Sequence, residues 1–317
     1  MLKSYFNKNT RKNLLRKLTL INVLIIVFLI LYTSCTKELN CKLEDTKSLV
    51  INSVFNPKNY FTFNLSYTTS PLNSYDSINE KLHFLFYEEN NLIIDTFLQS
   101  GILETNIRPI PNKEYKVEVL SDKLPSIITS DSIPNIVNID KAILIYPAGV
   151  DEYGDFCVEA MITFTDPPQE ENYYELLIYH LHKYDNEKNY WNWDGDVKIT
   201  DPVLLNEGDV DYLPSSLFFS DELFNGETYT LKVKRGGYNT RFETNSGCYA
   251  ELRSVSKSYY LYRKYYTRHV FNQQLQGEDL RDFIFMGEPR SMYTNVVNGY
   301  GIFAGYWGTT KELIYIK

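Results

Sequence analysis

The sequence has few of the residues from which compact metal sites are built. It contains four cysteines and four histidines in 317 residues, and no Cys-x-x-Cys or His-Glu-x-x-His motif. Ligands at such short spacings are the usual signature of zinc sites. His180 and His182 share one face of a predicted strand, but His83 and His269 lie far from them in the sequence. We therefore predict no metal site and no cofactor.

Acidic residues are absent before Glu38, whereas six basic residues occur in the first 17 positions. An apolar run follows over residues 18–32, interrupted only by Thr19 and Asn22. A basic segment, a short apolar segment and small residues after it are typical of a secretory signal peptide. The run is shorter than the roughly 20 residues of a membrane-spanning helix. A cleaved signal is therefore favoured over the alternative, a permanent N-terminal anchor helix.

The predicted signal ends in the residues LYTSC. Thr33 and Ser34 immediately before Cys35 resemble a bacterial lipobox, in which the cysteine is acylated with chains such as palmitate and becomes the new N-terminus. Tyr32 departs from the box, which prefers leucine there, and Cys41 lacks this context altogether. Stable attachment needs more than one acyl chain, at about 0.8 kcal/mol per buried methylene. We predict Cys35 as the lipidation site.

The charge of the predicted mature chain limits the classes of partner that it can bind. Removing residues 1–34 leaves 283 residues with all 40 acidic and 26 of the 32 basic ones, a formal charge of −14. Nucleic acids and anionic lipid headgroups need a basic surface, so neither is an expected partner. Attachment to the membrane would then depend on the acyl chains alone. The length favours two domains.

A period of two dominates the mature chain and predicts half-buried antiparallel strands. Clear examples are Phe61, Phe63, Leu65 and Tyr67, then Tyr115, Val117 and Val119, then Tyr229, Leu231 and Val233. The abundance of tyrosine and phenylalanine, 27 and 18 residues, agrees with strands. Only residues 256–274 have helical spacing, with Ser256 as a suitable N-cap. We expect a mainly all-β fold.

A turn-rich segment with two prolines, residues 124–138, predicts a domain boundary. We expect a signal peptide over 1–34, a tether over 35–46 and an immunoglobulin-like β-sandwich over 47–130, since the strand-rich unit has the size of that fold. A second β-sandwich over 131–317 would carry the helix.

Trp191, Trp193, Asp194 and Asp196 gather in a predicted loop and form the candidate ligand-binding site. Indole faces beside carboxylates could stack on a sugar ring or hold calcium, although the spacing is not that of an EF-hand. The favoured alternative is an acidic hairpin tip whose tryptophans fold onto the domain.

Cys157 and Cys248 could form a disulfide, because an exported protein meets oxidising conditions. Cys248 shares a strand face with Ala250 and Leu252 and should point inward, whereas Cys157 shares its face with the polar Glu159. The sequence leaves this bond open, since it does not fix the geometry.

No pattern in the sequence predicts catalysis. Paired carboxylates such as Glu170 and Glu171 are frequent. Acid–base chemistry requires one carboxyl group in apolar surroundings and the other in polar surroundings, and no pair in the sequence has this arrangement. The glycine-rich residues 299–308 lack the strand–turn–helix context of a dinucleotide site and are typical of strands. We predict no catalytic residue.

Four segments occur in an order that resembles a known family: residues 164–179, 220–233, 250–266 and 295–307. Together with the beginning of the mature chain, they look like the domain of unknown function 4249 family, lipoproteins of Bacteroidota-type Gram-negative bacteria. The resemblance covers essentially all of the mature chain. It implies an outer-membrane lipoprotein with β-sandwich domains, often encoded beside a TonB-dependent transporter, and it implies no chemistry.

We therefore expect a lipid-anchored outer-membrane protein that acts, without catalysis, as a binding or accessory component beside a TonB-dependent transporter. Its ligand is not indicated. Lys37 and Glu38 resemble the charged signal that sends some lipoproteins to the cell surface, which favours the surface over the periplasmic face. The alternatives are a surface glycan- or protein-degrading enzyme and a structural or adhesive surface lipoprotein.

Overall fold

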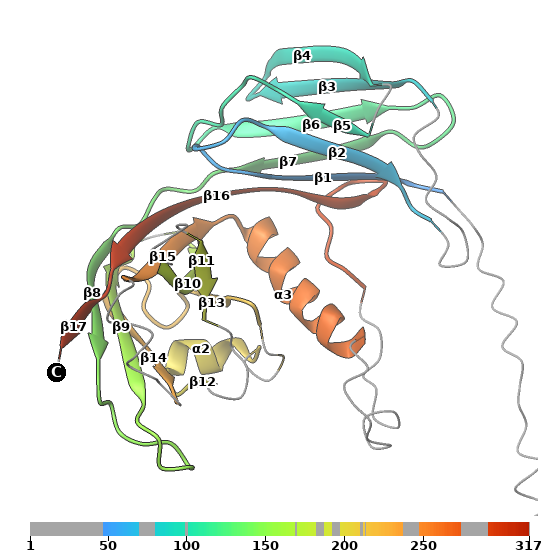
Figure 1. Cartoon of the computed structure of the whole chain (residues 1–317). Helices are drawn as coiled ribbons and strands as arrows, with labels where there is room; N and C mark the ends of the chain where they lie inside the picture. Colours follow the sequence, from blue (N-terminus) through green and yellow to red (C-terminus); the bar gives the residue numbers. More distant parts are fainter. Residues whose placement is uncertain are drawn as a thin grey trace, which may run out of the picture. The chain divides into compact units, whose positions relative to one another are not determined.

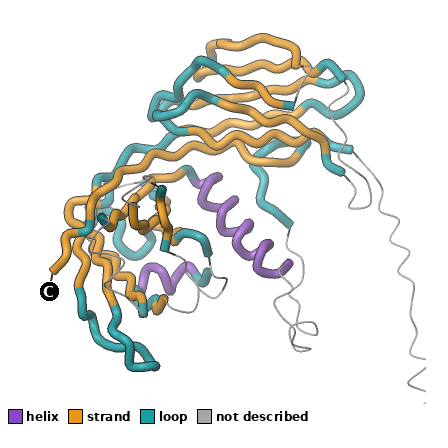
Figure 2. The backbone as a smooth tube through the Cα atoms, in the orientation of Figure 1, coloured by secondary structure: helices purple, strands orange, loops and turns teal. Residues whose placement is uncertain are grey.

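Strands make up most of the chain that the computed structural model describes (Figures 1 and 2). The described residues are 47–69, 80–98, 101–168, 170–181, 187–191, 197–209, 212, 214–236, 247–273 and 291–316. The predicted signal peptide and tether, with Cys35, lie outside them. Among these described residues no helix is long and apolar enough to cross a membrane. The prediction of a mainly β fold is confirmed, with 52% of the described residues in strands and 11% in helices.

The first hydrophobic core lies among the N-terminal strands. These are β1 (Leu49–Phe55), β2 (Thr62–Tyr67), β3 (Leu82–Glu88), β4 (Asn91–Leu98), β5 (Ile102–Glu104), β6 (Glu114–Leu120) and β7 (Ile127–Ser132). Strands β4, β3, β6 and β7 form one sheet, while β1, β2 and β5 belong to a second. The predicted alternation holds in β2, where Phe63 and Leu65 are buried and Thr62 and Asn64 are exposed. Stacked and edge-on rings fill this sandwich-like core.

The second core lies among the later strands. These are β8 (Ile139–Ile145), β9 (Val158–Thr165), β10 (Tyr173–Leu181), β11 (Lys188–Tyr190), β12 (Val197–Lys198), β13 (Leu217–Ser220), β14 (Thr228–Arg235), β15 (Cys248–Val255), β16 (Tyr300–Glu312) and β17 (Ile314–Ile316). One sheet has the order β12-β14-β9-β8-β17, and the other includes β11-β10-β15, with β13 also paired to β10. Apolar side chains from both sheets meet in this core, so the packing is again sandwich-like.

Strand β16 connects the two cores. Its first half pairs in parallel with β1, and its second half pairs antiparallel with β15 (Figure 1). Phe303 therefore packs in the first core, whereas Leu313, just after the strand, packs in the second. Gly301 allows the close approach to β1, because a Cβ there would overlap the Ile51 carbonyl oxygen. Its φ of 111° is also unfavourable for other residues. Both cores lie within one compact unit, Asp45–Lys317.

Within the described residues, helices α2 and α3 accompany the sheets (Figure 2). Helix α3 (Lys257–Gln273) matches the predicted segment, and the Ser256 hydroxyl caps it by accepting from the Tyr259 amide at 3.2 Å. It packs its tyrosines on Phe218, Ile302 and neighbouring apolar residues. Helix α2 (Pro202–Glu207) was not predicted, although its signals are in the sequence. Asp201 is its N-cap, proline follows at the first turn, and Gly208 ends it in the left-handed region.

Candidate functional site

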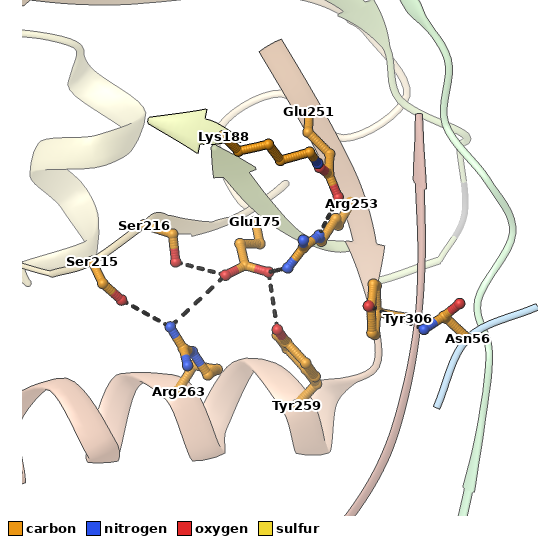
Figure 3. Close-up of polar contacts among 10 residues, drawn as sticks. All are labelled: Asn56, Glu175, Lys188, Ser215, Ser216, Glu251, Arg253, Tyr259, Arg263 and Tyr306. Atoms are coloured by element: carbon orange, nitrogen blue, oxygen red, sulfur yellow. Dashed lines mark hydrogen bonds and ion pairs between the residues drawn. The ribbon is translucent and has the colours of Figure 1, made fainter. Parts of the chain in front are cut away.

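Charged side chains gather where helix α3 meets the sheet, around Glu175 (Figure 3). Glu175 stands on β10 and is only 1% exposed. Arg253 lies directly opposite it on β15, and its Nη1 donates to Glu175 Oε2 at 2.8 Å. The Tyr259 hydroxyl donates to the same oxygen at 3.0 Å, and Ser216 Oγ donates to Oε1 at 2.6 Å. Donors from β15, from α3 and from the residue before β13 therefore hold one buried carboxylate.

Two further ion pairs extend this network along the sheet. Arg253 Nε donates to Glu251 Oε1 at 2.7 Å, and Lys188 Nζ donates to Glu251 Oε2 at 3.0 Å. Burial alone would raise the pKa of Glu251, but the charges of Arg253 and Lys188 outweigh it and hold the pKa below its usual value. Burial and the Glu175 carboxylate raise the pKa of Tyr259, which stays a hydrogen-bond donor. Glu175 and Glu251 thus each have a cation beside them.

A second group of charges joins α3 to the end of α2. Lys264 Nζ lies 2.6 Å from Glu207 Oε2 and 3.1 Å from Asp209 Oδ2. Arg268 Nη2 lies 2.6 Å from Asp209 Oδ1, and the Tyr260 hydroxyl donates to Glu207. A cavity of about 10 Å³ adjoins these side chains, lined also by Leu204, Pro214, Leu217, Phe218 and Thr267. That is about the room for one water molecule.

This geometry decides what the charges can do. Glu207 and Asp209 form a buried carboxylate pair, but both contact the same ammonium group of Lys264. An acid–base pair instead needs two carboxyl groups in contrasting environments. The arrangement therefore supplies ion pairs that fix α3 to the sheet and to α2.

The same region reaches the first core through two polar contacts. The Tyr306 hydroxyl on β16 accepts from Asn56 Nδ2 at 3.1 Å, and its ring lies under the Arg253 guanidinium. Asp131 on β7 accepts from the Ser256 hydroxyl and from the Gly305 amide. Burial raises the pKa of Asp131 to about 6, although these donors oppose the shift. The cap of α3 is thereby connected to both cores.

Comparison with known proteins places the whole of this arrangement in one family. A family model described as Domain of unknown function (DUF4249) matches residues 36–312. The chain belongs to the DUF4249 family. The match includes every strand from β1 to β16 and all of the charged network, so the predicted resemblance is confirmed. No curated protein matches the sequence.

The DUF4249 fold corrects the interpretation of Trp191 as part of a ligand-binding loop. Its side chain is 1% exposed and packs in the second core, where its Nε1 donates to His180 Nε2 at 3.1 Å. Because the indole is enclosed by the core, it offers no face to a ligand. Trp193, Asp194 and Asp196 lie outside the described residues.

The structure also answers the question of a disulfide. Cys157 and Cys248 are both buried, and no disulfide joins them. Cys157 precedes β9 in the five-stranded sheet, whereas Cys248 begins β15 in the other sheet. Within the described ranges, no three cysteine, histidine or acidic side chains are grouped so that they could hold a metal ion.

The residues of the charged network were not singled out from the sequence, although a signal was present. Glu175 occurs inside the apolar strand YYELLIY, and Glu251 inside YAELRSV. Charged side chains are rarely buried without a partner, so a carboxylate within a buried strand predicts a cation close by in space. Which cation this is depends on the strand register.

Proposed function

We propose that this DUF4249 protein is a lipid-anchored outer-membrane component that binds another protein beside a TonB-dependent transporter and performs no catalysis. The observation that supports the proposal most is that charged side chains are paired inside the fold while apolar side chains are exposed on its surface. The charges around α3 are paired with one another inside the fold. Apolar side chains, by contrast, stand exposed on β17 and on the turn that precedes β9. Exposed apolar patches mark sites of interaction with other macromolecules.

The membrane location in this proposal rests on the sequence. The basic and apolar N-terminal segments are typical of an export signal, and Cys35 stands where a lipobox cysteine would be acylated. The charged residues after it, Lys37 and Glu38, favour the cell surface. The transporter partnership comes from the resemblance to the DUF4249 family.

A structural or adhesive surface lipoprotein is the second candidate, and the exposed strand β17 favours it specifically. An apolar strand at a sheet edge can pair with many chains, including those of a surface layer. The two candidates differ in their partner. The first requires one stable transporter complex, whereas the second requires contacts with several surface components.

Affinity purification of the full-length, lipidated protein from outer membranes tests this proposal. We expect one TonB-dependent transporter to be recovered in an amount near that of the tagged chain. The Cys35→Ser variant, which the proposal keeps out of the membrane, is the matched control. Recovery of no transporter from membranes that contain the acylated chain would contradict the proposal.

A further inference from the structure

Strand β17 is an apolar strand at the edge of its sheet. It pairs with β8 and is the last strand of the five-stranded sheet within the described part of the chain. All three of its residues are exposed: Ile314, Tyr315 and Ile316, the first of them to 64%. An edge strand presents backbone N–H and C=O groups that another strand can pair with, and proteins usually protect such edges with charges or proline. The residues of β17 provide neither.

The hairpin of residues 146–157, which connects β8 to β9 (Figure 1), also has exposed apolar side chains, among them Val150 and Phe156. The Tyr146 amide donates to the Ile316 carbonyl at 3.3 Å, so the hairpin begins beside the end of β17. The rings of Tyr146 and Phe156 meet edge-on at 6.0 Å, and Phe156 pairs with Val150 across the hairpin. Tyr153 at the tip is 83% exposed. We call β17 and this hairpin together the β17 edge.

On one face of the sheet, apolar side chains of β8 and β9 lie next to those of β17. Ile314 pairs with Ile143 and Ile316 pairs with Ile145, so these four side chains lie on one face. Met161 stands beside Ile143 on β9 and is partly exposed. A strand added along β17 would therefore find apolar neighbours for alternate side chains, which is how such complexes obtain specificity.

The charge at the tip of the hairpin indicates what kind of strand fits. Asp151, Glu152 and Asp155 are the charged residues of this turn, and Glu152 and Asp155 are exposed. Asp151 Oδ1 accepts from the amides of Tyr153 and Asp155 at 2.9 and 2.8 Å, so the tip has a defined conformation. An acidic, ordered tip beside an apolar edge is complementary to a segment that carries both apolar and basic side chains.

We propose that the β17 edge binds an extended segment of another protein, apolar at alternate positions and basic, which adds to the five-stranded sheet as a further strand. The inference rests on the proposed function and names the surface that would perform it. A second copy of this chain is a poorer occupant. With a formal charge of −14 in its predicted mature form, it brings the wrong sign of charge to the acidic tip.

Binding of short fluorescent peptides to the full-length protein in detergent tests the inference. The probe alternates valine and lysine, and the comparison peptides replace every lysine by glutamate or every valine by glycine. We expect the valine–lysine peptide to bind at least about tenfold more tightly than either comparison peptide. Equal binding of the three peptides, or no binding of any, overturns the inference.

Two variants locate the binding. Ile314→Lys places a charge on β17 and should abolish binding, whereas Ile102→Lys, at a comparably exposed isoleucine of β5 (57%), should not. If Ile314→Lys impairs folding, Glu152→Lys/Asp155→Lys replaces it. Reversing these two exposed charges should weaken valine–lysine binding about threefold to tenfold and favour the glutamate peptide. Unchanged binding in both β17-edge variants contradicts the inference.

Sedimentation of the same samples tests whether a second copy of the chain occupies the β17 edge instead. A dimer of wild type that Ile314→Lys separates would show that the edge binds a second copy, which overturns the inference. The outcome is independent of the proposed function, because peptide binding needs neither the lipid nor a transporter. Peptide binding without a recovered transporter would leave the edge established and the transporter partnership wrong.

Discussion

Glu175 and Arg253 lie directly opposite each other on β10 and β15, with Arg253 Nη1 2.8 Å from Glu175 Oε2. The pair is buried against α3, whose Tyr259 donates to the same carboxylate. Moving two such charges out of water is costly, and their attraction offsets that cost only when further hydrogen bonds complete the site. Here Ser216 and Glu251 complete it, so the pair is a fixed part of the contact between helix and sheet.

Breaking the pair from one side should destabilise the fold strongly. We expect Glu175→Leu to lower the free energy of unfolding by about 3–5 kcal/mol, because it leaves Arg253 buried with one partner fewer. The double variant Glu175→Leu/Arg253→Met should recover part of the loss. Urea unfolding of the full-length protein in detergent measures both changes. Glu171→Gln is the control, since its exposed pair with Lys257 should contribute little.

The pH dependence of stability should contain two opposing contributions. Burial raises the pKa of Asp131 from 3.8 to about 6. Its contribution to the free energy of unfolding is therefore full below pH 3.8 and is lost as the pH rises through 6. Burial, then the nearby Arg235 charge, lowers the pKa of His180 from 6.5 to about 4. Its contribution is full above pH 6.5 and is lost as the pH falls through 4. In the wild type the two slopes partly cancel.

Removing either Asp131 or His180 should leave the pH dependence of stability that the other one causes. Between pH 6.5 and 4.5, acidification should destabilise Asp131→Asn, which retains the His180 slope, by about 1–3 kcal/mol. The same change should stabilise His180→Gln, which retains the Asp131 slope. Thermal unfolding of the three proteins across this range gives the slopes. Identical slopes in both variants would show that neither group titrates as described.

The close contact at Gly301 should make it intolerant of a side chain. A Cβ there would overlap the Ile51 carbonyl oxygen, and φ is 111°. We expect Gly301→Ala to cost on the order of 3 kcal/mol or more, because β16 must separate from β1. Gly154→Ala is the matched control, at φ 86° with no atom within 4 Å, and should cost about 1 kcal/mol. Equal unfolding midpoints would contradict the close pairing of β1 and β16.

The predicted lipid anchor separates two neighbouring cysteines. Cys35→Ser should abolish labelling with a palmitate analogue and release the chain from the membrane fraction, because no acyl chain then holds it. Cys41→Ser should be labelled and retained like the wild type. The reverse result would assign the anchor to Cys41.

Local sequence patterns predicted much of the fold. The rest depends on pairing between residues far apart in the sequence, which local patterns do not show. Alternation in residues such as Phe63 and Leu65 reports directly which face is buried, and Ser256 with its tyrosine spacing indicates α3. Nothing local shows that Phe303 joins a core formed mainly by residues 49–133. The partnership of Glu175 with Arg253 depends on a register between strands 78 residues apart. Trp191 packs in the second core, as the favoured alternative of tryptophans folded onto the domain predicts, so its polar neighbours in the sequence do not indicate a ligand-binding loop.

Photo-crosslinking in intact cells tests most directly that the protein binds a partner through the β17 edge. Benzoylphenylalanine replaces Tyr315 in the full-length protein, and the same residue at Ile102 serves as the control. We predict a specific adduct between position 315 and a TonB-dependent transporter, and none from position 102. No adduct at 315, the same adduct from both positions, or an adduct with a second copy of the chain would contradict this function.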